Sequence, residues 1–142
     1  LSKHENIVAV KEANGDISSI AKTRSLCGDD LDVYSGNDDE IVPIMSLGGI
    51  GVISVLSNIL PRETHNICEE FFKGNVEKAC ELQLKYVSLV NALFSDVNPI
   101  PVKEAMNMMG LGMGPLRMPL APMNEAAKEN LRKELIKHGL IK

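Results

Sequence analysis

The stretch IVAVKEANGD, residues 7–16, joins four consecutive apolar residues to a lysine and then to a turn. The apolar run predicts a strand over residues 7–11 that is buried on both faces, which is typical of a parallel sheet. Lys11 ends this strand, and Asn14-Gly15-Asp16 predicts a turn. Because an ammonium group is costly to remove from water, we expect a lysine in this place to be paired or to lose its proton.

Lys11 has a functional and a structural interpretation. Alternation along the strand places it on the same face as Ala9 and Ala13, whose small side chains leave space beside the amine. A buried lysine has a lowered pKa and can act as a neutral nucleophile that forms a Schiff base with a ketone. The alternative is a strand-end lysine that reaches solvent or pairs with Glu12, which is the commoner case. Periodicity alone leaves both interpretations open.

Outward from this stretch, strands and helices alternate. Asp16 is expected to cap the first helix, Asp38 or Asp39 the second, and Gly48 or Gly49 to end the second. The expected order is a strand at 7–11, a helix at 16–27, a strand at 31–36, a helix at 38–49 and a strand at 50–58. Connections this short predict right-handed crossovers and a parallel sheet, and therefore an α/β fold.

The remainder of the chain is predicted to be helical, at 61–73, 76–94, 98–110 and 124–138. Asn98 and Asn124 are the expected N-caps, with Pro99 at the first helical position of the third of these helices. Three apolar strands followed by four helices make a poor closed domain, because both faces and both edges of the sheet need cover. We therefore expect the strands to finish a larger sheet whose earlier strands lie outside this chain.

Two polar or glycine-rich motifs lie between these elements. In SLGGIGVIS, residues 46–54, the glycines close a helix and open a strand, the reverse of a nucleotide-binding loop. In YSGNDD, residues 34–39, Gly36 ends a strand. Ligands of parallel α/β folds bind at the carboxyl ends of strands, so Gly36 lies where the backbone can approach a small ligand closely. Asp38 and Asp39 are expected to be caps rather than catalysts.

Composition excludes several classes of function. A net charge of −4 with no run of Lys or Arg argues against nucleic acid, and 4% aromatic residues without Trp argues against base stacking. No apolar run approaches the roughly 20 residues of a membrane span. Three cysteines without a CxxC pair, and no signal peptide, favour reduced thiols in the cytoplasm. The three histidines lack metal-ligand spacing, so no metal site is expected.

Five motifs in order resemble the C-terminal half of the dihydrodipicolinate synthase family. They are VAVKEANGD (8–16), VYSGNDD (33–39), MSLGGIGVISV (45–55), NPIPVK (98–103) and LRMPLAPM (116–123). Any one of them is a weak signal, but the five together with their spacing cover nearly the whole chain. The resemblance implies a (β/α)8 barrel with a C-terminal helical extension. Residues 1–60 would be its sixth to eighth strands with their helices, and residues 61–142 the final barrel helix and the extension.

The resemblance also implies a chemistry and its residues. Lys11 matches the lysine that forms an imine with pyruvate, and the derived enamine attacks L-aspartate 4-semialdehyde in diaminopimelate and lysine biosynthesis. Gly36 and Ile53 match positions that line the pyruvate pocket. No metal or organic cofactor is implied, because the protonated imine is itself the electron sink.

Other implied parts lie outside these 142 residues. The tyrosine–threonine proton relay and the carboxylate-binding arginine of the family belong to earlier strands. The chain alone is therefore expected to be inactive and to need the N-terminal half of the same barrel, within an enzyme that is commonly a homotetramer. Two alternatives are a related pyruvate-dependent aldolase, such as N-acetylneuraminate lyase, and a non-catalytic half-barrel that acts only in assembly. A flavodoxin-like domain would need more than three strands.

Overall fold

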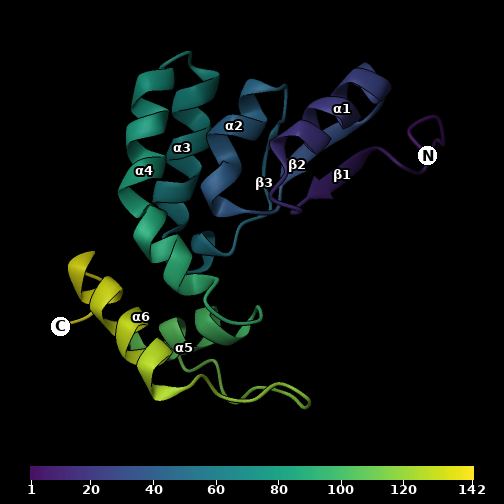
Figure 1. The fold of residues 1–142 in the computed structure, drawn as a ribbon. Coiled ribbons are helices and arrows are strands. Elements are labelled where there is room, and N and C mark those ends of the chain that lie inside the picture. The colour runs from purple at the N-terminus through teal and green to yellow at the C-terminus, as the bar shows by residue number, and fades with distance from the viewer. The chain divides into compact units, whose positions relative to one another are not determined.

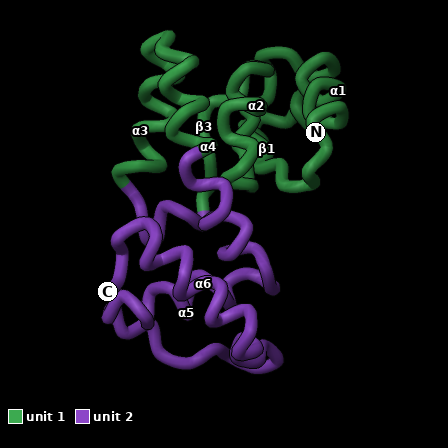
Figure 2. Tube along the Cα trace, turned by 60° about the vertical axis from the view of Figure 1, so that its left-hand side comes forward, with its two compact units in different colours: residues 1–54, 62–84 green, residues 55–61, 85–142 purple.

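Strands and helices alternate along the first part of the chain, and helices alone follow (Figure 1). The computed structural model describes residues 1–142. Its elements are β1 (Ala9–Glu12), α1 (Ile17–Cys27), η1 (Gly28–Asp30), β2 (Asp32–Ser35), η2 (Asp38–Glu40), α2 (Ile41–Ser46), β3 (Gly51–Val52), η3 (Leu56–Asn58), α3 (Pro61–Phe72), α4 (Val76–Leu93), α5 (Ile100–Met108) and α6 (Glu125–Lys137). They form two compact units, residues 1–54 with 62–84 and residues 55–61 with 85–142, which we call unit 1 and unit 2 (Figure 2).

The strands of unit 1 form a parallel sheet in the order β1-β2-β3, as predicted. The register pairs Lys11 with Tyr34 and Tyr34 with Gly51. Strands that run in one direction bring their carboxyl ends to one edge of the sheet, where α/β folds place ligands. The sheet thus positions the ends of β1, β2 and β3 side by side.

Helix α1 begins where the sequence predicts. The Asp16 side chain accepts hydrogen bonds from the backbone N–H groups of Ser18 and Ser19, at 2.9 and 3.2 Å. Ile20 of α1 packs in one buried cluster with Val33 of β2 and Ile44 of α2. Side chains of this size each contribute about 1.5–3 kcal/mol when they are fully buried. One face of the sheet is therefore covered by α1 and α2.

The prediction that the first strand is buried on both faces is wrong. Val8 is 69% exposed, Lys11 is exposed, and the strand itself spans only Ala9–Glu12. The physical reason is that β1 is an edge strand of a sheet of only three strands, so its outer edge has no neighbour within this chain. An apolar run predicts that a strand has to be buried by neighbouring elements, and this chain supplies only some of those elements.

Two further boundary predictions are corrected. The strand expected at 50–58 is limited to Gly51–Val52, because Leu56 turns into the η3 helix and is buried in the core of unit 2. Propensity for strand is overridden there by packing. The helix expected to begin with Asn98 as its cap has Pro99 at the N-cap instead, since the N–H of Ile100 already donates to the Val97 carbonyl oxygen at 2.8 Å.

The start of α2 shows why Asp38 and Asp39 do not cap it. The N-cap is Glu40, which makes no side-chain capping bond, and the predicted cap is therefore wrong. The backbone at the start of α2 is instead hydrogen-bonded by Gln83 of α4, which is distant in sequence. Its Oε1 accepts from the Val42 N–H at 2.7 Å, and its Nε2 donates to the Asp39 carbonyl oxygen at 2.8 Å.

Unit 2 has a core of its own. Helices α5 and α6 contribute to one buried cluster together with the later part of α4, and the side chains of Leu89, Leu131 and Leu135 have no exposed surface. Asn124 caps α6 as predicted, with its side chain accepting from the Ala127 N–H at 2.9 Å. None of the helices combines the length and the apolar character that crossing a membrane requires.

Candidate functional site

The three predicted site residues lie at the same edge of the sheet in unit 1. Lys11 is the third residue of β1, Gly36 directly follows β2, and Ile53 directly follows β3. Because the strands are parallel and adjacent, residues as far as 42 positions apart in sequence are brought to the same edge of the sheet. The sheet therefore collects an amine, a glycine backbone and an aliphatic side chain at one place.

Gly36 lies against the Lys11 side chain. A Cβ atom added to Gly36 would stand 2.8 Å from Lys11 Cε and 2.6 Å from Ala13 Cβ, closer than such atoms can approach. The Gly36 N–H also donates to the Glu12 carbonyl oxygen at 2.7 Å, which extends the pairing of β1 with β2. Only glycine leaves the lysine stem its room here. The position of the Lys11 side chain therefore depends on the absence of a side chain at residue 36.

The backbone of Ile53 is hydrogen-bonded, whereas its side chain is exposed to solvent. Its N–H donates to the Ser35 carbonyl oxygen at 2.8 Å, while the residue is 49% exposed. Tyr34, the register partner of Lys11, lies next to Gly51, where an added Cβ would only just touch the tyrosine ring at 3.7 Å. Lys11 and Ile53 are thus both accessible at an edge whose backbone is fixed.

Two residues of this region were not predicted as part of a site. Asp38, expected to be a helix cap, is 1% exposed, and its carboxylate accepts a hydrogen bond from the Ser54 hydroxyl. Ser54 directly follows Ile53, and Asp38 lies two residues after Gly36. The acidic pair after the strand in YSGNDD was a signal for Asp38, but nothing local in the sequence singles out Ser54.

In unit 1 the pKa of one cysteine thiol is shifted by its surroundings. Burial raises the pKa of the Cys68 thiol, and the negative charge of Asp38 raises it further. Cys68 therefore carries little thiolate near neutral pH and is a poor nucleophile. All three cysteines are free, and no group of three or more His, Cys, Asp or Glu side chains is arranged to hold a metal ion.

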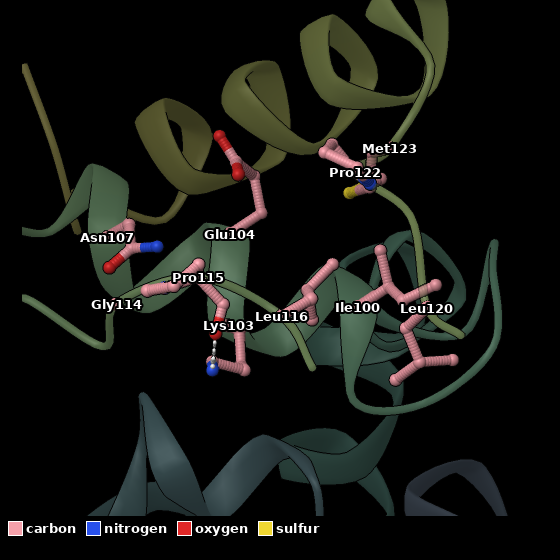
Figure 3. A pocket seen from close by; sticks show the side chains of 10 residues that line it. All are labelled: Ile100, Lys103, Glu104, Asn107, Gly114, Pro115, Leu116, Leu120, Pro122 and Met123. Carbon is pink, nitrogen blue, oxygen red and sulfur yellow. Dashed lines mark hydrogen bonds between the residues drawn. The ribbon is translucent and has the colours of Figure 1, made fainter. Parts of the chain in front are cut away.

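A cavity of about 200 Å³ lies in unit 2, between α5 and the extended segment that follows it (Figure 3). Its polar side chains already have partners within the chain. Lys103 Nζ donates to the Pro115 carbonyl oxygen at 2.7 Å, and Glu104 pairs with Lys128 at 2.7 Å. Asn107 accepts from the Met113 N–H. This cavity is lined by groups that hold the segment in place rather than by groups free to bind a ligand.

The parallel strands with a lysine near the carboxyl end of β1 define a class of protein, the α/β proteins that bind ligands at the carboxyl ends of their strands. Comparison with known families makes this specific. The chain belongs to the dihydrodipicolinate synthetase family, whose model matches residues 1–138.

Individual relatives agree with the family assignment. The chain is 58% identical over 142 residues to the 4-hydroxy-tetrahydrodipicolinate synthase of Clostridium perfringens strain SM101, covering all of this chain and 49% of that protein. The crystal structure of dihydrodipicolinate synthase from Thermotoga maritima matches with a TM-score of 0.93 and 45% identity, covering 99% of this chain and 48% of that one.

A monomeric dihydrodipicolinate synthase variant matches with a TM-score of 0.91 and 43% identity, over 99% of this chain and 48% of that one. The chain thus spans about half the length of the relatives it matches. Its α/β fold is that of part of the dihydrodipicolinate synthase barrel.

Proposed function

We propose that this chain is the C-terminal half of a 4-hydroxy-tetrahydrodipicolinate synthase. This lyase condenses pyruvate with L-aspartate 4-semialdehyde in diaminopimelate and lysine biosynthesis. The observation that carries the proposal is the Lys11 side chain lying against Gly36 at the carboxyl edge of a parallel sheet. Membership of the family and the 58% identity to a protein of that name support it.

In the proposed reaction Lys11 supplies the nucleophile. Its neutral amine attacks the keto carbon of pyruvate, and loss of water leaves a protonated imine. The imine withdraws electrons from the methyl carbon, which loses a proton to give an enamine. The enamine carbon attacks the aldehyde carbon of the semialdehyde, and the amino group of that substrate then displaces Lys11 by transimination, which closes the ring and frees the lysine. No metal or organic cofactor takes part in the proposal.

Gly36 and Ile53 are proposed to line the pyruvate pocket. Gly36 allows the backbone to approach the substrate and leaves the Lys11 stem unobstructed, as its distances to Lys11 and Ala13 indicate. Ile53 offers an exposed aliphatic side chain at the adjacent strand end, suited to the methyl group of pyruvate. In this role both residues position the substrate, and Lys11 alone performs the covalent chemistry.

The rest of the proposal concerns the whole enzyme. We assign β1, β2 and β3 to the sixth, seventh and eighth strands of a (β/α)8 barrel, with residues 1–60 in the barrel and 61–142 forming its last helix and the helical extension. The partner that completes the barrel is the N-terminal half, which adds the proton relay and the arginine for the substrate carboxylate. We further propose a cytoplasmic homotetramer. The three free cysteines suit a reducing compartment.

The test uses a completed barrel, in which this chain follows the N-terminal half of the Clostridium perfringens relative. It is offered pyruvate with aspartate semialdehyde, N-acetylmannosamine or glyceraldehyde, and consumption of each aldehyde is measured. We expect turnover with aspartate semialdehyde, and none from the 142-residue chain alone. Preference for another aldehyde would assign a related aldolase. Absence of any turnover would instead favour a non-catalytic assembly role.

A further inference from the structure

We propose that Asp38 and Ser54 are positioning residues, whose hydrogen bond fixes the two loops that carry Gly36 and Ile53 at a common spacing. The inference rests on the proposed function, because it concerns the shape of the pocket in which Lys11 meets pyruvate. Neither residue is proposed to touch the substrate.

The location of the bond supports this role. Ser54 directly follows Ile53, and Asp38 lies two residues beyond Gly36, so the bond joins the loops just after their pocket positions. Asp38 is 1% exposed and Ser54 is half-buried. A carboxylate withdrawn from water is costly unless hydrogen bonds compensate it. The chain thus carries a buried acid at a place where a capping residue would normally be exposed.

Backbone bonds hold the strand ends as far as Gly36 and Ile53, the first residues of the two loops. The Gly36 N–H donates to the Glu12 carbonyl oxygen, and the Ile53 N–H donates to that of Ser35. These bonds link β1 to β2 and β2 to β3 at this edge. Beyond them, the Ser54 hydroxyl on Asp38 is a side-chain link that continues the pairing from the β2 loop to the β3 loop.

Asp38 is itself anchored on the other side. The carbonyl oxygen of the next residue, Asp39, accepts from Gln83 Nε2 at 2.8 Å, and Gln83 also accepts from the Val42 N–H. Before it, the Ser35 hydroxyl donates to the Asn37 carbonyl oxygen at 2.7 Å. These bonds fix the backbone on both sides of Asp38. The hydrogen bond from Ser54 to the Asp38 carboxylate then helps to position Ser54 and the adjacent Ile53.

The type of acceptor is informative. A hydrogen bond to an ionised carboxylate is roughly twice as strong as one between neutral groups. The charge of Asp38 also acts on Cys68, whose thiol pKa it raises. A bond of this strength suits a link that must keep Ile53 in place while its side chain remains free to meet a ligand.

The test compares Ser54→Ala with Ser54→Thr in the completed barrel. Ser46→Ala is the matched control, because it also removes a serine hydroxyl that donates a hydrogen bond, here to the Pro43 carbonyl oxygen, but at an exposed residue outside the two loops. The readouts are KM for pyruvate, KM for aspartate semialdehyde, the rate at which borohydride traps the pyruvate imine, and Tm.

We expect Ser54→Ala to raise KM for pyruvate and slow imine trapping by about tenfold, the worth of one hydrogen bond. KM for the semialdehyde should change little, and Tm should fall because the buried Asp38 carboxylate loses a hydrogen bond. Ser54→Thr, which keeps the hydroxyl, should restore both pyruvate values, and Asp38→Asn should fall between because a neutral acceptor remains. Pyruvate kinetics for Ser54→Ala equal to those of Ser46→Ala would overturn the inference and leave the proposed function intact. No imine in the unmodified barrel would overturn both.

Discussion

The two units of the chain differ in how fully they bury their apolar surface. In unit 2 the helices enclose a large cluster in which Leu89, Leu131 and Leu135 have no exposed surface. In unit 1 the sheet is covered on the side of α1 and α2, but Val8, Lys11 and Ile53 are exposed. A well-packed helical core and an open strand edge therefore coexist in one chain.

This difference separates stability from function. Unit 2 has a buried core of its own, so the residues of that core are expected to influence mainly the free energy of unfolding. The strand edge of unit 1 leaves the Lys11 amine and the aliphatic side chain of Ile53 exposed to solvent. Exposed apolar surface is unfavourable, and in our proposal it becomes useful when further groups complete a pocket. Substitutions in the two units should accordingly affect different measurements.

The largest effect is expected from Lys11→Met in the completed barrel. Without the amine no imine can form, so trapping of pyruvate by borohydride and turnover should both be lost. Lys22→Met removes an exposed lysine of α1 and should leave both unchanged. Mass spectrometry of the reduced protein measures the trapped imine. Residual labelling of the Lys11→Met variant at the original level would place the reactive amine elsewhere.

The next effect concerns unit 2 and stability. Leu89→Ala leaves a cavity in the core and should lower the free energy of unfolding by about 2–5 kcal/mol, as truncation of buried leucines does. Leu84→Ala on the same helix removes a side chain that is 69% exposed and should cost less than about 0.5 kcal/mol. Urea titration of the 142-residue chain followed by circular dichroism compares them. Equal shifts would contradict the packing described for unit 2.

Gly36→Ala should affect both stability and function. The added methyl group would meet Ala13 Cβ at 2.6 Å and Lys11 Cε at 2.8 Å, and such overpacking costs about 1–3 kcal/mol. The double variant Ala13→Gly/Gly36→Ala removes the first contact and should recover stability, measured as Tm. It should not recover pyruvate trapping, because the lysine stem is still displaced. Full recovery of trapping would show that Gly36 serves the backbone alone.

The smallest effect is a pH dependence within unit 2. His138 lies beside the Tyr86 ring with Glu134 at 3.7 Å, and burial lowers its pKa despite that carboxylate, with Lys137 and Lys85 acting in the same direction as burial. A base with a lowered pKa binds fewer protons in the folded state, so stability is lost as pH falls below about 6.5.

The matched variant for this effect is His138→Phe, which keeps a ring against Tyr86 but cannot take up a proton. Unfolding midpoints in urea, measured from pH 7.5 to pH 5, should fall for the unmodified chain and fall less for the variant. Parallel curves would mean that other groups set the acid sensitivity of unit 2.

Local signals in the sequence predicted those features that depend on neighbours in the chain. Asp16 and Asn124 cap α1 and α6 as expected, because capping involves residues two or three positions away. The parallel order of the strands and their shared edge were also predicted, although strand lengths were not.

Features that depend on distant residues were missed. Asp38 was expected to be a cap, and it instead accepts a hydrogen bond from Ser54, 16 residues away. Gln83, 41 residues from Val42, bonds to the backbone at the start of α2. The burial of β1 was also mispredicted. An apolar run indicates that a strand favours burial, but it does not show that the same chain provides the residues that bury it. Roles of Lys11, Gly36 and Ile53 rest on the family resemblance and stay predictions.

The central claim is that Lys11 becomes a pyruvate-binding amine when the open edge of unit 1 is completed. The most direct measurement is borohydride reduction with pyruvate of the 142-residue chain and of the completed barrel, followed by peptide mapping of the label. Our account predicts label on Lys11 alone in the completed barrel, and little on any lysine of the isolated chain. Label on a different lysine, or equal labelling of Lys11 in both proteins, would contradict it.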